Sequence, residues 1–126
     1  MTRGRATHIE LTLVDRPGAT RVLRDAIDRV AEPLRASPAD RFDLKLAATE
    51  ALTNALRDSS ESHVTLDGGP EALDVEVASG GAFGAQSLHG DEGGRGIPLM
   101  LALVDRVEFA HTSHGTRVRM QKRIAA

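Results

Sequence analysis

The sequence predicts an α/β fold of the α+β type, a two-layer sandwich in which helices cover one face of a mixed, mostly antiparallel sheet. Two observations predict this fold. Several short segments alternate apolar and polar residues, as half-buried strands do, and two longer segments repeat apolar residues at helical spacing. The order along the chain is strand, helix, helix, strand, strand, helix, strand, strand, so that most strands follow one another as hairpins.

The first half of the chain predicts one strand and two helices. Residues 7–14 (THIELTLV) alternate, and the segment RPG at 16–18 ends this strand. From about residue 19 to 34 the apolar positions follow helical spacing. The segment SPAD at 37–40 predicts a helix N-cap with proline in the first turn, and this second helix continues to about Ser60.

The second half predicts two hairpins around a third, short helix. Residues 62–67 (SHVTLD) and 72–79 (ALDVEVAS) are expected strands joined by a glycine-proline turn. Residues 80–94 form a glycine-rich loop, and residues 97–104 are expected to be helical. The segments VEFAH and TRVRMQKRI predict a closing hairpin that turns at residues 113–115.

Length and composition exclude several classes of protein. The 126 residues fit a single domain over residues 1–126. The absence of cysteine excludes disulfide frameworks and thiolate metal sites and agrees with the cytoplasm. No apolar run approaches a membrane span, and the opening MTRGRATHIE shows no apolar signal segment. With a net charge of −2 and three Phe as the only aromatic residues, we expect a cytoplasmic protein that binds neither nucleic acid nor a membrane.

The second predicted helix carries three polar residues, Glu50, Asn54 and Asp58, at four-residue intervals. They form a stripe that borders the apolar face of the helix. Side chains one turn apart, with a rise of about 6 Å, can converge on one ligand. A carboxylate can orient water or accept a proton, and an amide oxygen can bind Mg²⁺. The alternative is a solvated helix edge, because Glu and Asn are ordinary surface residues.

A second motif, Gly93-Gly94-Arg95-Gly96, lies directly before the third predicted helix. Glycines allow backbone N–H groups to approach a phosphate, and a helix N-terminus adds positive potential. Arg95 offers a bidentate contact to an anion. The alternative is a flexible loop with glycines at a helix entry. The motif is neither a Walker loop nor a dinucleotide fingerprint, because the required spacing and strand–turn–helix context are absent.

Taken together, these segments resemble the GHKL ATPase superfamily, and most closely its anti-sigma-factor serine/threonine kinase branch, over nearly the whole chain. The segment ATEALTNALRD resembles the N-box, with Glu50 at the general-base position and Asn54 at the Mg²⁺-ligand position. The segment GGRGIPLMLALVDRVEF resembles the glycine box and its helix. The segment HGTRVRMQKR resembles the last strand, in which Thr116 borders the phosphate and adenine side.

The resemblance implies a mechanism and partners. ATP–Mg²⁺ binds between the helices and the lid loop, Asn54 holds the metal, and Gly94, Arg95 and Gly96 cradle the phosphates. Glu50 deprotonates or orients a Ser or Thr hydroxyl of a partner. In this branch a homodimer sequesters a sigma factor, and a STAS-type anti-sigma antagonist releases it. An opening strand and helix, without a dimerisation helix bearing a phospho-accepting His, favour this branch over sensor kinases.

The adenine box departs from the family pattern. The family has Asp-x-Gly-x-Gly after the third strand, where the Asp accepts a hydrogen bond from the adenine amino group. In the segment VEVASGGAFGA, Ser79 stands at the Asp position, Gly81 at the first Gly and Phe83 at roughly the usual aromatic position. Because a Ser hydroxyl is short and uncharged, we expect this contact to be weaker by about 1–3 kcal/mol. Asp67 is interpreted as a turn residue rather than a substitute.

Asp58 and three histidines receive no functional role. Many relatives have His at the position of Asp58, and an Asp near a helix C-terminus opposes the helix dipole. Metal coordination and repulsion of phosphate both remain open for this carboxylate. His89, His111 and His114 show no metal-ligand spacing with a matching carboxylate and are interpreted as surface or loop histidines.

Two functions therefore follow from the sequence. The first is an ATP-dependent protein serine kinase that sequesters a sigma factor, supported by Glu50, Asn54 and the Gly-Arg-Gly turn. The alternative is a non-catalytic module of the same fold, which regulates transcription by binding a sigma factor or an antagonist with weak or no ATP binding. Ser79 supports the alternative. A sensor-kinase catalytic domain ranks third, because the chain opens with its own strand and helix.

Overall fold

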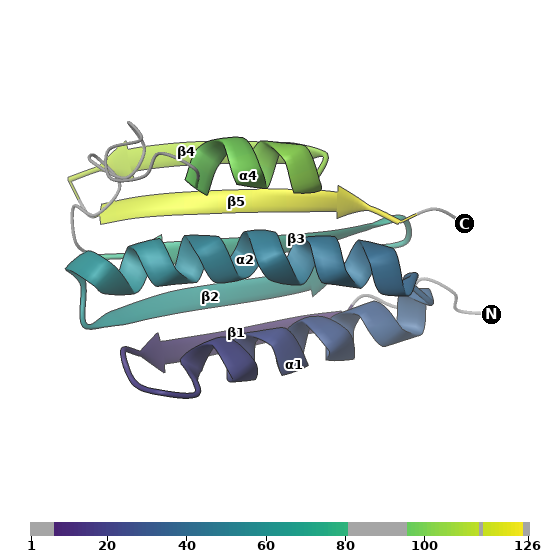
Figure 1. The fold of residues 1–126 in the computed structure, drawn as a ribbon, viewed down its shortest axis with the longest axis horizontal. Helices are drawn as coiled ribbons and strands as arrows, with labels where there is room; N and C mark the ends of the chain where they lie inside the picture. The colour runs from purple at the N-terminus through teal and green to yellow at the C-terminus, as the bar shows by residue number, and fades with distance from the viewer. Residues whose placement is uncertain (1–6, 81–95, 114, 125–126) are drawn as a thin grey trace.

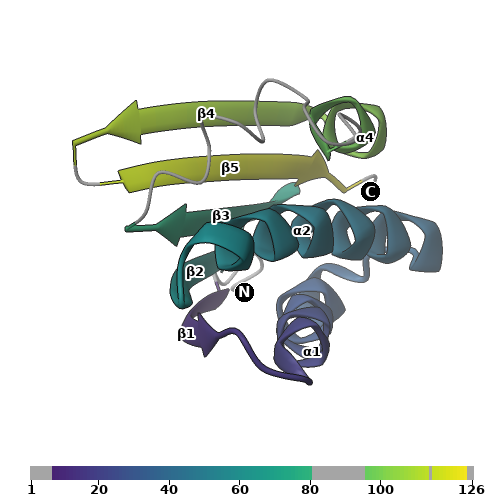
Figure 2. The same cartoon turned by 60° about the vertical axis from the view of Figure 1, so that its left-hand side comes forward.

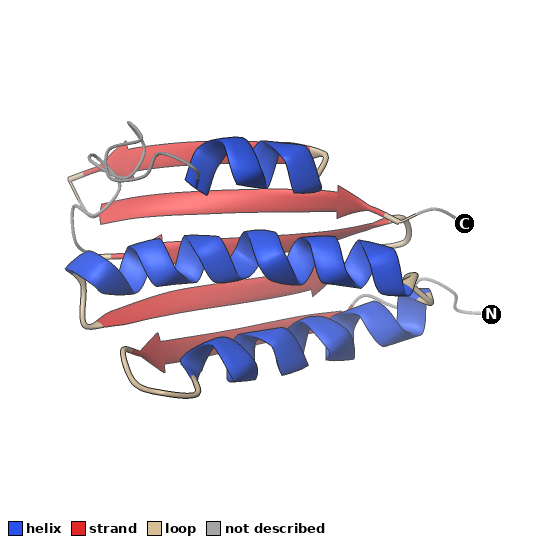
Figure 3. Ribbon diagram, viewed as in Figure 1, coloured by secondary structure: helices blue, strands red, loops and turns tan. Residues whose placement is uncertain are grey.

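The computed structural model describes residues 7–80, 96–113 and 115–124 of the chain. Within these residues, three α-helices lie over one face of a five-stranded sheet (Figures 1 and 3), which confirms the predicted two-layer α/β fold. In chain order the elements are β1 (Thr7–Val14), α1 (Ala19–Ala31), the 3₁₀ turn η1 (Glu32–Leu34), α2 (Pro38–Asp58), β2 (Glu61–Gly68), β3 (Ala72–Ser79), α4 (Gly96–Leu103), β4 (Arg106–Thr112) and β5 (Gly115–Arg123).

The sheet has the strand order β1-β2-β3-β5-β4. All four pairings between the described strands are antiparallel, so the sheet that we expected to be mixed and mostly antiparallel is antiparallel throughout this part of the chain. The predicted closing hairpin is confirmed, because Thr112 at the end of β4 pairs with Gly115 at the start of β5. Viewed from the side, the strands form one layer and the helices the other (Figure 2).

Local chemistry explains where the first two helices begin and end. The Ser37 hydroxyl accepts a hydrogen bond from the backbone N–H of Asp40 at 3.0 Å, which is the predicted N-cap of α2. The helix predicted over residues 19–34 is divided, because its last residues form the 3₁₀ turn η1. Pro33 lies in that turn and has no N–H to continue the α-helical hydrogen bonds.

The core lies between the sheet and the helices. Leu23 and Ile27 of α1 and Leu44 and Leu52 of α2 are fully buried against alternate residues of the strands. Each such side chain contributes about 1.5–3 kcal/mol on burial. The other buried positions of α2 are the small residues Ala47, Ala48, Ala51 and Ala55, and the helix lies over the middle of the sheet, between α1 and α4 (Figure 1). No helix in the described ranges combines the length and apolar character needed to cross a bilayer.

Candidate functional site

One edge of α2 carries polar side chains that the fold partly buries. Asn54 is only 7% exposed, and Glu50, one turn earlier, is half-buried. Both lie beside the buried Ala47 and Ala51 when the helix is plotted at 100° per residue. The structure gives neither side chain a hydrogen bond or ion pair to another described residue. Asn54 is nevertheless not a buried group without a partner, because Thr49 Oγ1 is the one such side-chain atom among the described residues. Its amide is therefore a polar group at the edge of the core that remains able to bind a ligand.

This edge of α2 faces β5 and α4. Asp43, on the same stripe as Glu50, accepts a hydrogen bond from Lys122 of β5 at 3.3 Å. The Lys122 ammonium group also donates to the backbone carbonyl of Leu103, the last residue of α4, at 2.8 Å. The end of α4 is therefore fixed beside the first half of α2. Because eight helical residues span about 12 Å, the start of α4 at Gly96 lies toward the half of α2 that carries Asn54 (Figure 1).

A row of four polar residues crosses the helix-facing side of the sheet. Ser62 of β2 pairs with Ser79 of β3, Ser79 pairs with Thr116 of β5, and Thr116 pairs with His111 of β4. The next positions along the same face are apolar in every one of these strands. Ser62, Ser79 and Thr116 are 1%, 5% and 2% exposed, whereas His111 lies at the exposed end of the row.

Hydrogen bonds and a close backbone contact hold this row in place. The Ser62 hydroxyl donates to the carbonyl of Ala78 at 2.8 Å. The Thr116 hydroxyl and Nδ1 of His111 are 2.8 Å apart. Gly115, with φ of +130°, brings β5 against the end of β3 so tightly that a Cβ atom there would lie 2.0 Å from the Ser79 carbonyl oxygen. The spacing of Ser79 and Thr116 therefore depends on a glycine at this turn.

The structure brings together some of the predicted site residues. The end of α2, the end of β3, the start of β5 and the start of α4 all lie at the left-hand end of the view in Figure 1. Asn54 lies in the last turns of α2, Ser79 ends β3 and Thr116 is the second residue of β5, so these three belong to the same end of the fold, whereas Glu50 lies nearer the middle of α2. Gly96 is the first residue of α4.

Several predicted residues lie outside the part of the chain that the structure describes. Gly81, Gly94 and Arg95 of the predicted site lie outside the described residues, as do Phe83, His89 and His114. Asp58 ends α2, but its side chain is likewise outside the description. The interpretation of Asp67 as a turn residue is corrected. It lies within β2, opposite His8 of β1 and Asp74 of β3, one residue before the strand ends.

Two members of the polar row were not among the predicted site residues. Nothing in the sequence marks Ser62 as a site residue, since a serine in a strand is ordinary. The sequence predicts His111 to be a surface or loop histidine, and the side chain is exposed, but its ring also contacts the buried Thr116 hydroxyl. Only the pairing of β2 with β3 and of β4 with β5 places these residues in the same row as Ser79.

The donor set fits a nucleotide that carries its own metal ion. A buried amide oxygen is a ligand that Mg²⁺ accepts, and hydroxyl groups can hydrogen-bond the edge of a base. The described residues contain no group of three or more His, Cys, Asp or Glu side chains arranged to hold a metal.

Other cavities lie among the described residues, away from this donor set. The first, of about 340 Å³, lies between the β1–α1 connection and the end of α2, and Arg16, Thr20, Thr53 and Arg57 are among its lining residues. Its lining includes neither Asn54 nor any member of the polar row, so this cavity is separate from the row at Ser79.

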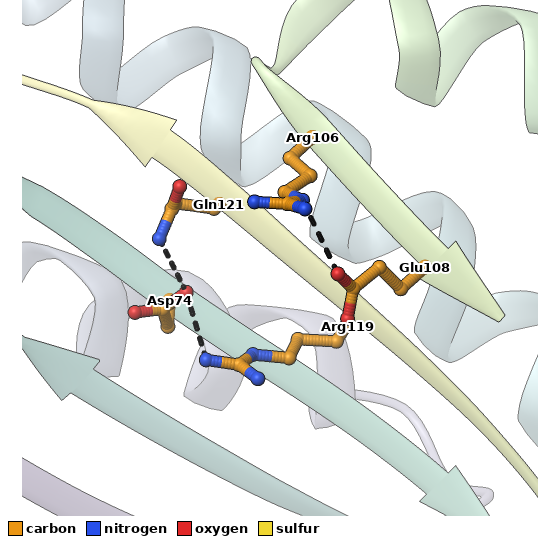
Figure 4. Close-up of a pocket in the computed structure, with 5 residues that line it drawn as sticks. All are labelled: Asp74, Arg106, Glu108, Arg119 and Gln121. Atoms are coloured by element: carbon orange, nitrogen blue, oxygen red, sulfur yellow. Dashed lines mark hydrogen bonds and ion pairs between the residues drawn. The ribbon is translucent and has the colours of Figure 1, made fainter. Parts of the chain in front are cut away.

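The second cavity, of about 110 Å³, lies on the open face of the sheet and is lined by Asp74, Arg106, Glu108, Arg119 and Gln121 (Figure 4). Its charges pair with one another. Arg106 meets Glu108 at 3.2 Å, while Arg119 and Gln121 both approach Asp74, at 3.7 and 3.3 Å. The cavity therefore offers little net charge to a ligand.

The open face also holds a histidine with altered proton affinity. His8 of β1 forms hydrogen bonds with Glu10 of the same strand and with Asp67 of β2. The hydrogen bond to Glu10, followed by that to Asp67, raises the pKa of His8 above its ordinary value of 6.5. The same bond lowers the pKa of Glu10 below 4.5. These groups lie on the face of the sheet away from the helices.

The chain is similar to known proteins both in sequence and in structure. Residues 13–122 match the family model described as histidine kinase-like ATPase domain. Among solved structures, the chain is similar to the crystal structure of the RsbU and RsbW domains of Rv1364c from Mycobacterium tuberculosis, with a TM-score of 0.74 and 20% sequence identity. The alignment covers 95% of this chain and 33% of that chain, so the chain spans about a third of that protein's length. No curated protein matches the sequence.

Proposed function

The chain belongs to the family of histidine kinase-like ATPase domains, and from this premise we propose that it is an ATP- and Mg²⁺-dependent serine/threonine protein kinase of the anti-sigma-factor type. Membership of this family implies nucleotide binding. The protein substrate that we propose is a Ser or Thr hydroxyl on an antagonist of the anti-sigma factor. Support for the specific kinase type comes from the resemblance of the N-box, the glycine box and the last strand to that branch.

The observation that carries the proposal is the position of Asn54, which is only 7% exposed, on the edge of α2 that faces α4. Glu50 lies one turn away on the same edge, and Ser79 and Thr116 lie at the same end of the fold. One carboxylate, one amide and two hydroxyls at one end of a layer suit a ligand with a metal-bound phosphate end and a hydrogen-bonding base.

Each residue then has a role that its chemistry allows. ATP with Mg²⁺, when bound, supplies the transferable phosphoryl group. The Asn54 carboxamide oxygen ligates the metal without adding negative charge beside the phosphates. The Glu50 carboxylate accepts the proton from the attacking hydroxyl or orients it. The hydroxyls of Ser79 and Thr116 bind the base and fix its orientation.

The remaining roles rest on the sequence. Gly94, Arg95 and Gly96 cradle the phosphates, and Gly81 allows close approach of the backbone to the base. The partners in this proposal are a sigma factor, which a homodimer of this chain sequesters in the cytoplasm, and a STAS-type antagonist, which carries the phosphorylated hydroxyl. No contact with nucleic acid or membrane belongs to the proposal.

ATP titration followed by calorimetry and by thermal unfolding tests nucleotide binding. A ligand that binds only the folded state at a concentration of 100 times its Kd stabilises that state by about 2.7 kcal/mol. We expect stabilisation by ATP and a larger effect when Mg²⁺ is present. No heat and no change in unfolding temperature at millimolar ATP, with or without Mg²⁺, would remove the kinase proposal.

Two substitutions on α2 separate the roles of metal binding and proton transfer. Asn54→Ala should remove the extra stabilisation given by Mg²⁺, whereas Glu50→Gln should leave ATP binding intact and abolish phosphate transfer to the partner. Thr53→Ala is the matched control, because Thr53 is exposed in the same helical segment and lies about 100° around the helix from Asn54. Transfer that continues unchanged in Glu50→Gln would refute the assignment of the base.

The two site residues on the sheet, Ser79 and Thr116, favour a second candidate function. Ser79 stands where the family has an Asp, and Ser79 and Thr116 are almost fully buried in this structure. Both features suit a module of the same fold that regulates transcription by binding the sigma factor or the antagonist without useful nucleotide binding. If this protein captured the sigma factor but did not bind ATP, that result would establish the second function over the first.

A further inference from the structure

His111 joins the exposed edge of the sheet to a buried hydroxyl of the candidate site. It lies on β4 directly opposite Thr116 of β5, and its Nδ1 atom is 2.8 Å from the Thr116 hydroxyl oxygen. Thr116 is 2% exposed and pairs on its other side with Ser79. The imidazole is therefore positioned to control which way the Thr116 hydroxyl points.

The direction of this hydrogen bond decides what Thr116 can offer to a ligand. A hydroxyl has one hydrogen to donate and two lone pairs that accept, and a neutral imidazole has one donor and one acceptor nitrogen. If Nδ1 accepts, the hydroxyl hydrogen is committed to His111 and the oxygen offers only lone pairs. If Nδ1 donates, the hydroxyl hydrogen remains available. A buried hydroxyl hydrogen needs an acceptor, and Nδ1 is the group that the structure places beside it.

A hydroxyl restricted to accepting would distinguish two classes of purine. The 6-position of adenine carries an amino group that donates, whereas a 6-oxo purine presents a carbonyl oxygen that accepts. Ser79 carries no charge that would make this distinction by itself. The carboxylate that would make it in the resembling family is absent from this chain.

We propose that His111 is a positioning residue that accepts the Thr116 hydroxyl hydrogen through Nδ1, and that it thereby makes the site selective for 6-amino purine nucleotides over 6-oxo purine nucleotides. Because this inference rests on the proposed nucleotide binding, its test compares two nucleotides that differ only in the base. ATP and inosine triphosphate are such a pair, since they share the sugar and the triphosphate.

Three single variants test the role of the ring. His111→Phe keeps a ring but removes the acceptor, so the preference for ATP over inosine triphosphate, measured as the ratio of their Kd values, should fall roughly three- to tenfold. His111→Asn restores an acceptor near the position of Nδ1 and should retain most of the preference. His63→Phe is the matched control, because His63 faces Thr12 at 3.3 Å in a similar pair on the open side of the sheet. It should leave the ratio unchanged.

A double-mutant cycle shows whether His111 acts through Thr116. In a Thr116→Val background, where no hydroxyl remains, adding His111→Phe should not change the ratio further. An independent measurement is ¹⁵N NMR of the His111 ring in the wild-type protein at a pH where it is neutral. It should show the proton on Nε2, and this measurement stands even if a variant fails to fold.

The outcomes separate this inference from the proposed function. A ratio unchanged in His111→Phe, or a neutral ring that carries its proton on Nδ1, overturns the role of His111 while nucleotide binding stands. A further loss of preference in the Thr116→Val background also overturns it, because His111 would then act by another route. Failure of both ATP and inosine triphosphate to bind the wild-type protein refutes the proposed function and this inference together.

Discussion

Replacing Gly115 by alanine should disrupt the candidate site by pushing two strands apart. Gly115 has φ of +130°, a backbone conformation that residues with a side chain rarely adopt. An added Cβ would lie 2.0 Å from the Ser79 carbonyl oxygen and 3.0 Å from Cα of Gly80. Because Cβ atoms essentially never approach within 3.0 Å, the backbone of β3 or β5 must move.

Two other glycines allow the loss of stability in Gly115→Ala to be divided into backbone strain and steric contact. Gly18 has φ of +98° but nothing within 4 Å of an added Cβ, so Gly18→Ala measures backbone strain alone, about 1–2 kcal/mol. Gly80 has neither feature, so Gly80→Ala should change stability by less than about 1 kcal/mol. Gly115→Ala combines the strain with a forced movement that costs about 1–3 kcal/mol more, for a total of about 2–5 kcal/mol.

Urea unfolding at equilibrium measures the free energies of unfolding of the three glycine variants under identical conditions. We expect the order of destabilisation Gly115→Ala, then Gly18→Ala, then Gly80→Ala. Among folded molecules, only the Gly115 variant should also show weaker ATP binding, because the displaced backbone carries Ser79. If Gly115→Ala lowers the free energy of unfolding no more than Gly18→Ala does, the close contact between β5 and the end of β3 does not exist in the protein.

Three further predictions concern the site, the open face and the helix layer. Ser79→Asp restores the carboxylate of the resembling family, so it should tighten ATP binding while it destabilises the unliganded protein by burying a charge. Calorimetry measures the change in affinity and urea unfolding the change in stability. An unchanged affinity for ATP would contradict the adenine contact. The raised pKa of His8 stabilises the fold at pH values below the ordinary 6.5, and this stabilisation is lost as the pH rises through the raised pKa. The lowered pKa of Glu10 also stabilises the fold, but that stabilisation is lost only as the pH falls below 4.5. Between about pH 5.5 and pH 9 the wild type should therefore lose more stability than His8→Gln, and parallel pH profiles would refute this. Lys122→Met removes the donor to the Leu103 carbonyl and should lower the free energy of unfolding by about 1–3 kcal/mol in urea, so a neutral result would show that Lys122 does not fix the end of α4.

The sequence determined the elements because their signals are local. Alternation of apolar residues identified the strands, and the segment SPAD predicted an N-cap that the Ser37–Asp40 hydrogen bond confirms. The four-residue spacing of Glu50 and Asn54 likewise placed them on one edge of a helix. Such patterns involve residues within a turn or two of each other, so the chain reveals them without a partner element.

Tertiary structure alone decided what those residues face. The spacing on α2 could not distinguish a solvated edge from a buried one, and packing against the sheet and α4 leaves Asn54 buried. The row from Ser62 through Ser79 and Thr116 to His111 depends on the register of three strand pairings, which joins residues up to 54 positions apart in sequence, from Ser62 to Thr116. Register is fixed when the apolar faces of all strands are buried together, a property of the assembled sheet rather than of any one segment.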